Sequence, residues 1–192
     1  MRVAGQGYIA YRKGALALYA LQDYIGEDKV NQALSRFLNQ HKGQSNPYPV
    51  SKDLVQEFSK VTPDSLQYLI KDLFKTITLY DNRVQEAEYE ATDDGQYKVT
   101  MTVKSDKYRA DSLGEQKAVD LDDYVDVGVF AQSEGDEELG DVLYLQKHHI
   151  DESRETFTVT VDQKPRKAGF DPYLKLIDRN KDDNVKTLEK PE

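Results

Sequence analysis

Apolar residues over the first 76 positions recur at helical spacing and are interrupted by short polar turns. Residues 9–24 form a strongly apolar stretch that ends before Gly26, and the apolar residues of 27–41 lie on one stripe. Two further helices are predicted over 52–60 and from Thr62-Pro63-Asp64 to about residue 76, because this order of residue types is typical of a helix start. The pattern therefore predicts four helices joined by short turns, a helical hairpin stack.

The first of these helices has unusual features. It is apolar nearly all round its middle, so we expect it to be buried on more than one side. Gly14 lies inside it, at a cost of about 1 kcal/mol relative to alanine, and such a glycine indicates close approach of another backbone. Gly26 is predicted to end the helix.

From Ile77 onward the pattern changes to the alternation of a β-strand. Residues 86–91 alternate glutamates with apolar side chains, residues 97–104 alternate apolar side chains with lysines and threonines, and Asp93-Asp94-Gly95 between them is a hairpin signal. Opposed rows of glutamate and lysine would form the solvated outer face of this pair, so Glu86, Glu88 and Glu90 are not interpreted as catalytic. Further strands are predicted over 116–121, 124–132, 142–149 and 155–163, with loops at 106–114 and 133–140.

This change of period predicts an α+β fold, in which the N-terminal helical hairpin stack is followed by an antiparallel β-sandwich. The expected division is a helical domain over 1–80, a β-sandwich over 81–177 and a charged, partly disordered tail over 178–192.

Composition narrows the classes of function. The chain has 192 residues and a net charge of −9, which argues against nucleic acid as a partner because phosphate binding needs clustered positive charge. It has no cysteine, so it offers neither a disulfide framework nor a thiolate metal site. No apolar run approaches the ~20 residues that span a bilayer, and residues 1–7 are too short and polar for a signal peptide. We therefore expect the chain itself to be soluble.

Metal-ligating residues are sparse. The chain has three histidines, His41, His148 and His149, and none belongs to a His-Glu-x-x-His or Glu-x-x-His pattern. His148 and His149 lie in one predicted strand and would point to opposite faces. A zinc site built from this chain alone is therefore not expected.

The tail contains a partial match to a calcium-binding loop. Asp178, Asn180 and Asp182 fall at positions 1, 3 and 5, and Glu189 falls at position 12. Asp183 occupies position 6, where such loops need glycine, so a solvated acidic tail is the preferred interpretation. The sequence has no Gly-x-Ser-x-Gly, phosphate-loop or Rossmann pattern.

The most specific motif is Tyr11-Arg12-Lys13-Gly14-Ala15 together with the apolar run after it. This segment resembles the helix after the zinc site in M1-family (gluzincin) zinc aminopeptidases. The resemblance implies that Tyr11 is catalytic and donates a hydrogen bond to the oxyanion that forms on the substrate carbonyl. The alternative is a tyrosine packed on a helix, and the spacing of Tyr8 to Lys13-Gly14 does not fit the motif.

The resemblance continues through residues 26–34, Tyr48–Leu54 and Thr62–Ser65, and residues 168–179 resemble the end of a bacterial subgroup fused to ABC-2-type permease transmembrane helices. It implies a C-terminal fragment of a membrane-tethered zinc aminopeptidase, with zinc and the peptide substrate held by the parent protein, which would lie in the bacterial inner membrane. The zinc motif is not in this sequence, so the chain alone is expected to be inactive.

A second hypothesis is a non-catalytic module, helical plus β-sandwich, that contacts a protein partner. The two hypotheses differ in the outer face of helix 9–24. In a fragment this face would be an uncovered apolar patch, and the chain would self-associate through it. A natural module would cover the face with its own residues.

Overall fold

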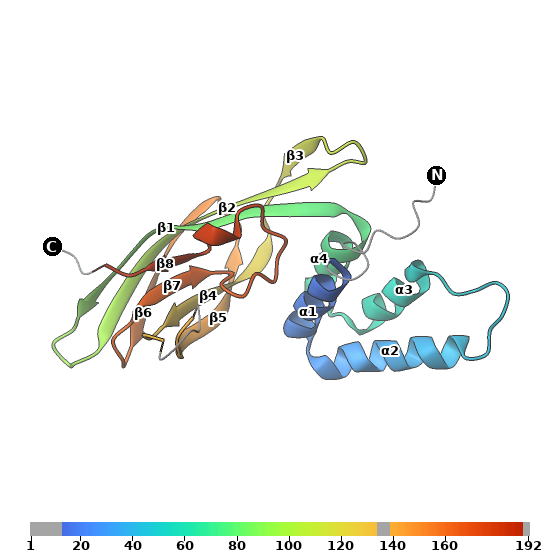
Figure 1. Cartoon of the computed structure of the whole chain (residues 1–192), viewed down its shortest axis with the longest axis horizontal. Coiled ribbons are helices and arrows are strands. Elements are labelled where there is room, and N and C mark those ends of the chain that lie inside the picture. Colours follow the sequence, from blue (N-terminus) through green and yellow to red (C-terminus); the bar gives the residue numbers. More distant parts are fainter. Residues whose placement is uncertain (1–12, 134–138, 190–192) are drawn as a thin grey trace. The chain divides into compact units, whose positions relative to one another are not determined.

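A computed structural model describes residues 13–133 and 139–189. The chain divides into two units, Met1–Thr78 and Leu79–Glu192, and each is described by itself. Within the described residues the fold is α+β, with helices first and antiparallel sheets afterwards, as the change of period predicted (Figure 1).

The helical unit has the predicted order of elements. Its main helices are α1 (Gly14–Ile25), α2 (Glu27–His41) and α3 (Ser51–Val61). Gly26 has φ 91° and its N–H donates to the carbonyl of Gln22 at 2.8 Å, which confirms the predicted stop of α1. Residues 9–12 of the predicted first helix lie outside the described residues.

Each of these helices contributes one apolar face to a shared core. The fully buried side chains Leu21, Phe58, Leu69 and Ile70 lie at its centre, and the rings of Phe58 and Phe74 stack at 5.6 Å. The side of α1 that carries Ala17, Ala20, Leu21 and Ile25 is buried here, at the spacing of one helical face.

The fourth predicted helix is not one regular helix. It consists of the 3₁₀ turn η2 (Asp64–Leu66), the short α4 (Gln67–Ile70) and the wider π-type turn η3 (Lys71–Lys75). The side chain of Gln67 donates to the carbonyls of Ser59 and Thr62, both at 2.8 Å. These bonds satisfy carbonyls at the end of α3 and fix the chain direction where α4 begins.

The β unit is a two-sheet sandwich. Among the described residues, β1 (Ile77–Ala91), β2 (Tyr97–Ala110), β3 (Gln116–Val119) and β6 (Arg154–Val161) form the first sheet. The second has the order β5 (Val142–Ile150), β4 (Asp123–Phe130), β7 (Lys167–Phe170) and β8 (Val185–Thr187). Alternate residues of both sheets meet in one core, led by Val99, Met101 and Val103 of β2 and by Val125, Val127 and Val129 of β4.

Two sequence-based predictions are wrong in this unit. Residues 106–110, predicted as loop, continue β2 and pair with β3. The inward positions near the end of β2 look polar in the sequence, yet Ser105 donates to Asn82 at 2.6 Å and Lys107 pairs with Asp123 at 2.8 Å, so both are buried with partners.

The second error concerns the described part of the predicted tail, residues 178–189. It forms the turn η4 (Lys181–Asp183) and the strand β8, and Asn184 and Leu188 are buried. The N–H of Tyr89 also donates to the carbonyl of Glu189 at 3.1 Å, which binds this segment to β1. Buried Leu188 and the strand pairing with β7 hold a segment whose charged side chains are otherwise solvated.

The predicted outer-face pairing of glutamate with lysine is confirmed by Lys98, whose ammonium lies 2.8 Å from Glu90. Among the described residues, no helix is long and apolar enough to cross a membrane.

Candidate functional site

The outer face of the second sheet carries a cavity beside a loop that packs on two glycines. Gly128 of β4 lies opposite Gly169 of β7 in the antiparallel pair. A Cβ atom on Gly169 would lie 2.7 Å from Cβ of Pro172, and one on Gly128 would lie 2.8 Å from the ring of Phe130. The missing side chains therefore allow the loop after β7 to pack directly onto the sheet.

Asp171 holds this loop in place. The residue is 1% exposed and has a φ of 50°, a conformation that aspartate tolerates better than most residues. Its carboxylate accepts the backbone N–H groups of Lys175 at 3.0 Å and Leu176 at 2.9 Å, and its own N–H donates to the carbonyl of Asp126 at 2.8 Å. Burial, with a smaller contribution from Asp126, raises the pKa of Asp171 to about 7.

A buried ionic cluster lies beneath the same loop. Asp126 of β4 is 4% exposed and binds two ammonium groups, Lys147 of β5 at 2.8 Å and Lys175 of the loop at 2.7 Å. Two cations around one carboxylate compensate its desolvation. The cluster joins the loop to two strands.

Tyr173 projects from this loop and forms one wall of the cavity. Its ring lies edge-on to the ring of Phe130 at 6.1 Å, and the ammonium of Lys175 lies 5.5 Å from its centroid. These two contacts fix the ring, although Tyr173 remains 36% exposed.

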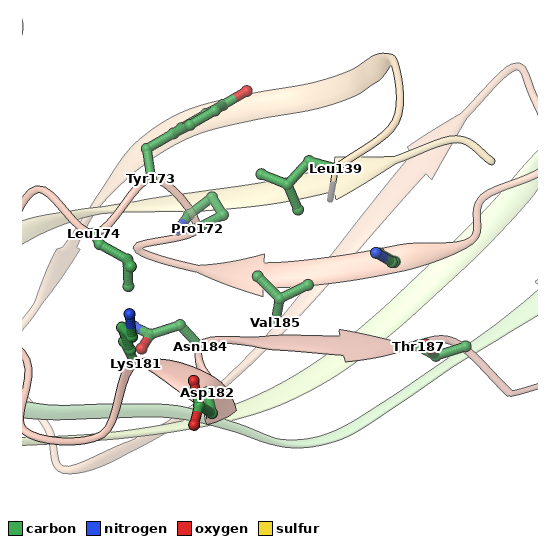
Figure 2. A pocket seen from close by; sticks show the side chains of 10 residues that line it. Leu139, Pro172, Tyr173, Leu174, Lys181, Asp182, Asn184, Val185 and Thr187 are labelled. Atoms are coloured by element: carbon green, nitrogen blue, oxygen red, sulfur yellow. The ribbon is translucent and has the colours of Figure 1, made fainter. Parts of the chain in front are cut away.

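The cavity itself has a volume of about 440 Å³. Figure 2 shows its lining residues, which come from the connection before β5, from β7 and the loop after it, and from the segment that contains η4 and β8. The apolar part of the lining consists of Leu139, Pro172, Tyr173, Leu174 and Val185. The polar part consists of Lys167, Lys181, Asp182, Asn184 and Thr187.

Asn184 is the most constrained of the polar residues. It is fully buried, and its Nδ2 donates to the carbonyl of Phe170 at 2.9 Å. Its Oδ1 has no hydrogen-bond partner among the described residues. An unsatisfied buried acceptor of this kind costs about 1–3 kcal/mol.

The tyrosine predicted to be catalytic, Tyr11, lies outside the described residues. The description begins at Lys13, which has helical backbone angles, and α1 starts at Gly14. On α1 the large apolar side chains Leu16 and Tyr19 are 43% and 48% exposed, in contrast to the expectation that the helix is buried on more than one side.

The three histidines have separate hydrogen-bond partners. His41 bonds Gln44 at 2.6 Å near the end of α2. On β5, His148 bonds the hydroxyl of Tyr144 at 2.7 Å, and His149 bonds Asp122 at 2.6 Å. The hydrogen bond to Asp122 raises the pKa of His149.

Among residues 13–133 and 139–189, no group of three or more His, Asp or Glu side chains is placed to hold a metal ion. The described residues therefore do not fit a zinc ion.

The loop that partly matched a calcium site has another role in the structure. The carboxylate of Asp178 accepts the N–H groups of Asn82 at 2.8 Å and Asn180 at 2.9 Å, and Asn180 bonds Asp183 at 2.8 Å. Burial raises the pKa of Asp178. The interpretation of this segment as solvated tail is thus corrected: Asp178 fixes the turn against β1.

Sequence reasoning missed the cavity and its residues. Its lining spans residues 139 to 187, and the short strands β7 and β8 that carry part of it were not predicted. A signal was present in residues 168–179, a segment singled out only for its resemblance to known proteins. Pro172 and Asp171 within it indicate a fixed turn.

No protein-family model matches the chain. A search of curated proteins found no match either.

Proposed function

We propose that this chain is the C-terminal part of a membrane-tethered zinc metallo-aminopeptidase, which removes N-terminal residues from peptides. The observation that carries the proposal is the segment Tyr11-Arg12-Lys13-Gly14-Ala15, which leads directly into the apolar helix α1. This arrangement resembles the tyrosine helix of M1-family enzymes. The parent protein would lie in the bacterial inner membrane.

In this proposal Tyr11 is the catalytic group that the chain contributes. Its phenol would donate a hydrogen bond to the oxygen of the substrate carbonyl as negative charge develops there. A donor that is positioned before the reaction stabilises the transition state more than the ground state, which is the condition for catalysis. The zinc ion would be bound by parts of the parent that this sequence does not contain.

The exposed side chains of α1 support the proposal. Leu16 and Tyr19 lie on the helix that comes after Tyr11, while Ala17, Ala20 and Leu21 between and beside them are buried in the helical core. Large apolar side chains on a helix next to a catalytic residue are what the rest of a catalytic domain would cover.

The alternative is a non-catalytic module that contacts a protein partner. Such a module would cover the outer face of α1 with its own residues, whereas Leu16 and Tyr19 are 43% and 48% exposed. Self-association of the isolated chain through α1 would be expected of a fragment.

Activity of the isolated chain provides the first test. We expect the purified chain, supplied with zinc and aminoacyl-p-nitroanilides, to show no turnover and no stoichiometric zinc, because the sequence has no His-Glu-x-x-His pair. Metal content would be measured after dialysis, and turnover by absorbance. Steady release of nitroaniline that depends on zinc would contradict the proposal.

A further inference from the structure

A groove in the helical unit runs along one side of α3. Its volume is about 510 Å³, which lies within the range of ligand pockets. Part of its lining comes from α3, where Ser51, Val55 and Ser59 follow one another at the spacing of one helical side. The other part comes from Phe74 and Lys75 at the end of η3. We call this site the α3 groove.

The apolar part of the lining is held in place by packing. Val55 and Phe74 are half-buried and pack against the helical core. The ring of Phe74 also stacks on the buried ring of Phe58, with the centroids 5.6 Å apart. A side chain that is already fixed loses little conformational entropy when a ligand binds to it. The α3 groove therefore offers a preformed contact surface for an apolar side chain.

The charged residues of the lining are both lysines. Lys52 and Lys75 are exposed, and neither forms an ion pair with another described residue. The neighbouring carboxylate of Asp53 accepts the N–H of Val50 at 2.8 Å and so caps α3, and Asp72 on η3 is buried. The groove thus presents two positive charges on a chain of net charge −9. This local charge favours a ligand that carries carboxylates.

The exposed apolar surface continues at the start of α3. Val50, which directly precedes Ser51 of the lining, is 54% exposed, and Tyr48 is 74% exposed. Such side chains are typical of a protein-binding surface, because a small ligand in the groove would leave them in water. Nucleic acids and anionic membranes are larger and would meet the net negative charge of the whole chain. A short protein segment fits the apolar and the charged residues together.

We infer that the α3 groove binds a short acidic segment of a partner protein. An apolar side chain of the segment packs against Val55 and Phe74, and its carboxylates lie at Lys52 and Lys75. This binding requires neither zinc nor turnover. It therefore goes beyond the proposed peptidase role, and its test can fail while that role stands.

The test is binding of defined peptides to the full chain, measured by fluorescence anisotropy. The probes are the fluorescein-labelled peptide Gly-Asp-Glu-Phe-Glu-Gly, the same peptide with serine in place of phenylalanine, and the basic counterpart Gly-Lys-Lys-Phe-Lys-Gly. We expect saturable binding of the first peptide and a Kd higher by about fivefold or more for the serine form. The net charge of the chain alone would favour the basic peptide, so a preference for the acidic peptide reports the two lysines.

Variants then locate the site. Lys52→Glu and Lys75→Glu change exposed side chains and should each raise the Kd of the acidic peptide by about fivefold or more. Lys29→Glu makes the same charge change at an exposed position of α2 outside the lining, and it should leave the Kd within about twofold. Far-UV circular dichroism checks that each variant keeps its helices.

Four results would overturn the inference. The first is an absence of saturable binding of the acidic peptide to the natural chain up to about 1 mM. The second is binding of the basic peptide or of the serine form as tight as that of the acidic peptide with phenylalanine. The third is an equal loss of affinity in Lys29→Glu and Lys52→Glu. The fourth is a dimer of the natural chain that Lys52→Glu dissociates and the acidic peptide does not, which would assign the groove to a second copy.

Discussion

At the scale of single residues, Asp171 determines how the loop after β7 is built. A carboxylate that is 1% exposed and accepts two backbone N–H groups replaces the hydrogen bonds that a regular turn would supply. The carboxylate of Asp126 lies in the same cluster and disfavours a second negative charge. Burial and this neighbour keep Asp171 protonated at a pH where an exposed aspartate is ionised.

This residue predicts a dependence of stability on pH. The pKa of Asp171 rises from 3.8 to about 7 on folding, so the folded protein binds a proton that the unfolded chain has released. The free energy of unfolding should therefore fall as pH rises from about 4 to about 7, by at most about 1.4 kcal/mol per pH unit from this group. Asp171→Asn removes the titration.

Urea unfolding at pH 5.0 and 7.5 would measure this effect. Other groups titrate in both proteins, so the informative quantity is the difference in free energy of unfolding between Asp171→Asn and the natural protein. The free energy of unfolding of Asp171→Asn, minus that of the natural protein, should rise by about 2 kcal/mol from pH 5.0 to pH 7.5. The substitution Asp182→Asn, at an exposed position, controls for the loss of a negative charge. If the free energy of unfolding of Asp171→Asn and of the natural protein changed in parallel with pH, the raised pKa of Asp171 would be contradicted.

At the scale of elements, a buried ion pair joins the two sheets of the sandwich. Lys107 of β2 binds both carboxylate oxygens of Asp123 of β4, at 2.8 and 2.9 Å, and the hydroxyl of Tyr80 of β1 donates to the same carboxylate at 3.0 Å. Lys107 is 5% exposed and Asp123 is 1% exposed. Each charge therefore depends on the other for its compensation.

Replacing one member of this ion pair should lower the free energy of unfolding more than replacing both members. Lys107→Met leaves a buried carboxylate without its cation and should lower the free energy of unfolding by about 3–5 kcal/mol. Adding Asp123→Leu should restore most of that loss, because no buried charge remains. Urea unfolding of the single and double variants measures both effects.

An exposed pair offers the matched control. Lys98 and Glu90 also join neighbouring strands, but their side chains are 46% and 58% exposed. Lys98→Met should leave the free energy of unfolding close to unchanged, since water already screens the pair. A double variant of Lys107 and Asp123 that is no more stable than Lys107→Met would show that the pair is not the source of the effect.

The elements that sequence could predict are those with a regular period. Helix 27–41 and the strand over 142–149 have strong patterns, and the structure confirms them with shifts of at most one residue at their ends. The second half of β2 was not predicted, because Lys107 looks like a loop residue until its partner Asp123, on another strand, is known. An ion pair between two strands cannot be predicted from the hydrophobic period of either strand.

The candidate site was less predictable for the same reason. The cavity is lined by residues from 139 to 187, and the close packing of Gly128 and Gly169 against Phe130 and Pro172 is revealed only in the folded chain. Tyr11, in contrast, was found by its local motif, which requires no knowledge of the fold. Its catalytic role stays a prediction.

At the scale of the whole molecule, the two units have different parts in the proposal. The helical unit carries the segment that resembles an aminopeptidase, and the β unit carries the cavity beside Tyr173.

The most direct test of the central claim is turnover by the intact parent protein with the substitution Tyr11→Phe. We expect kcat for an aminoacyl-p-nitroanilide to fall by about 10²–10³-fold, the effect of losing one oxyanion donor, while the bound zinc stays unchanged. This combination would place Tyr11 at the reacting carbonyl. Retention of full kcat by Tyr11→Phe would contradict the account.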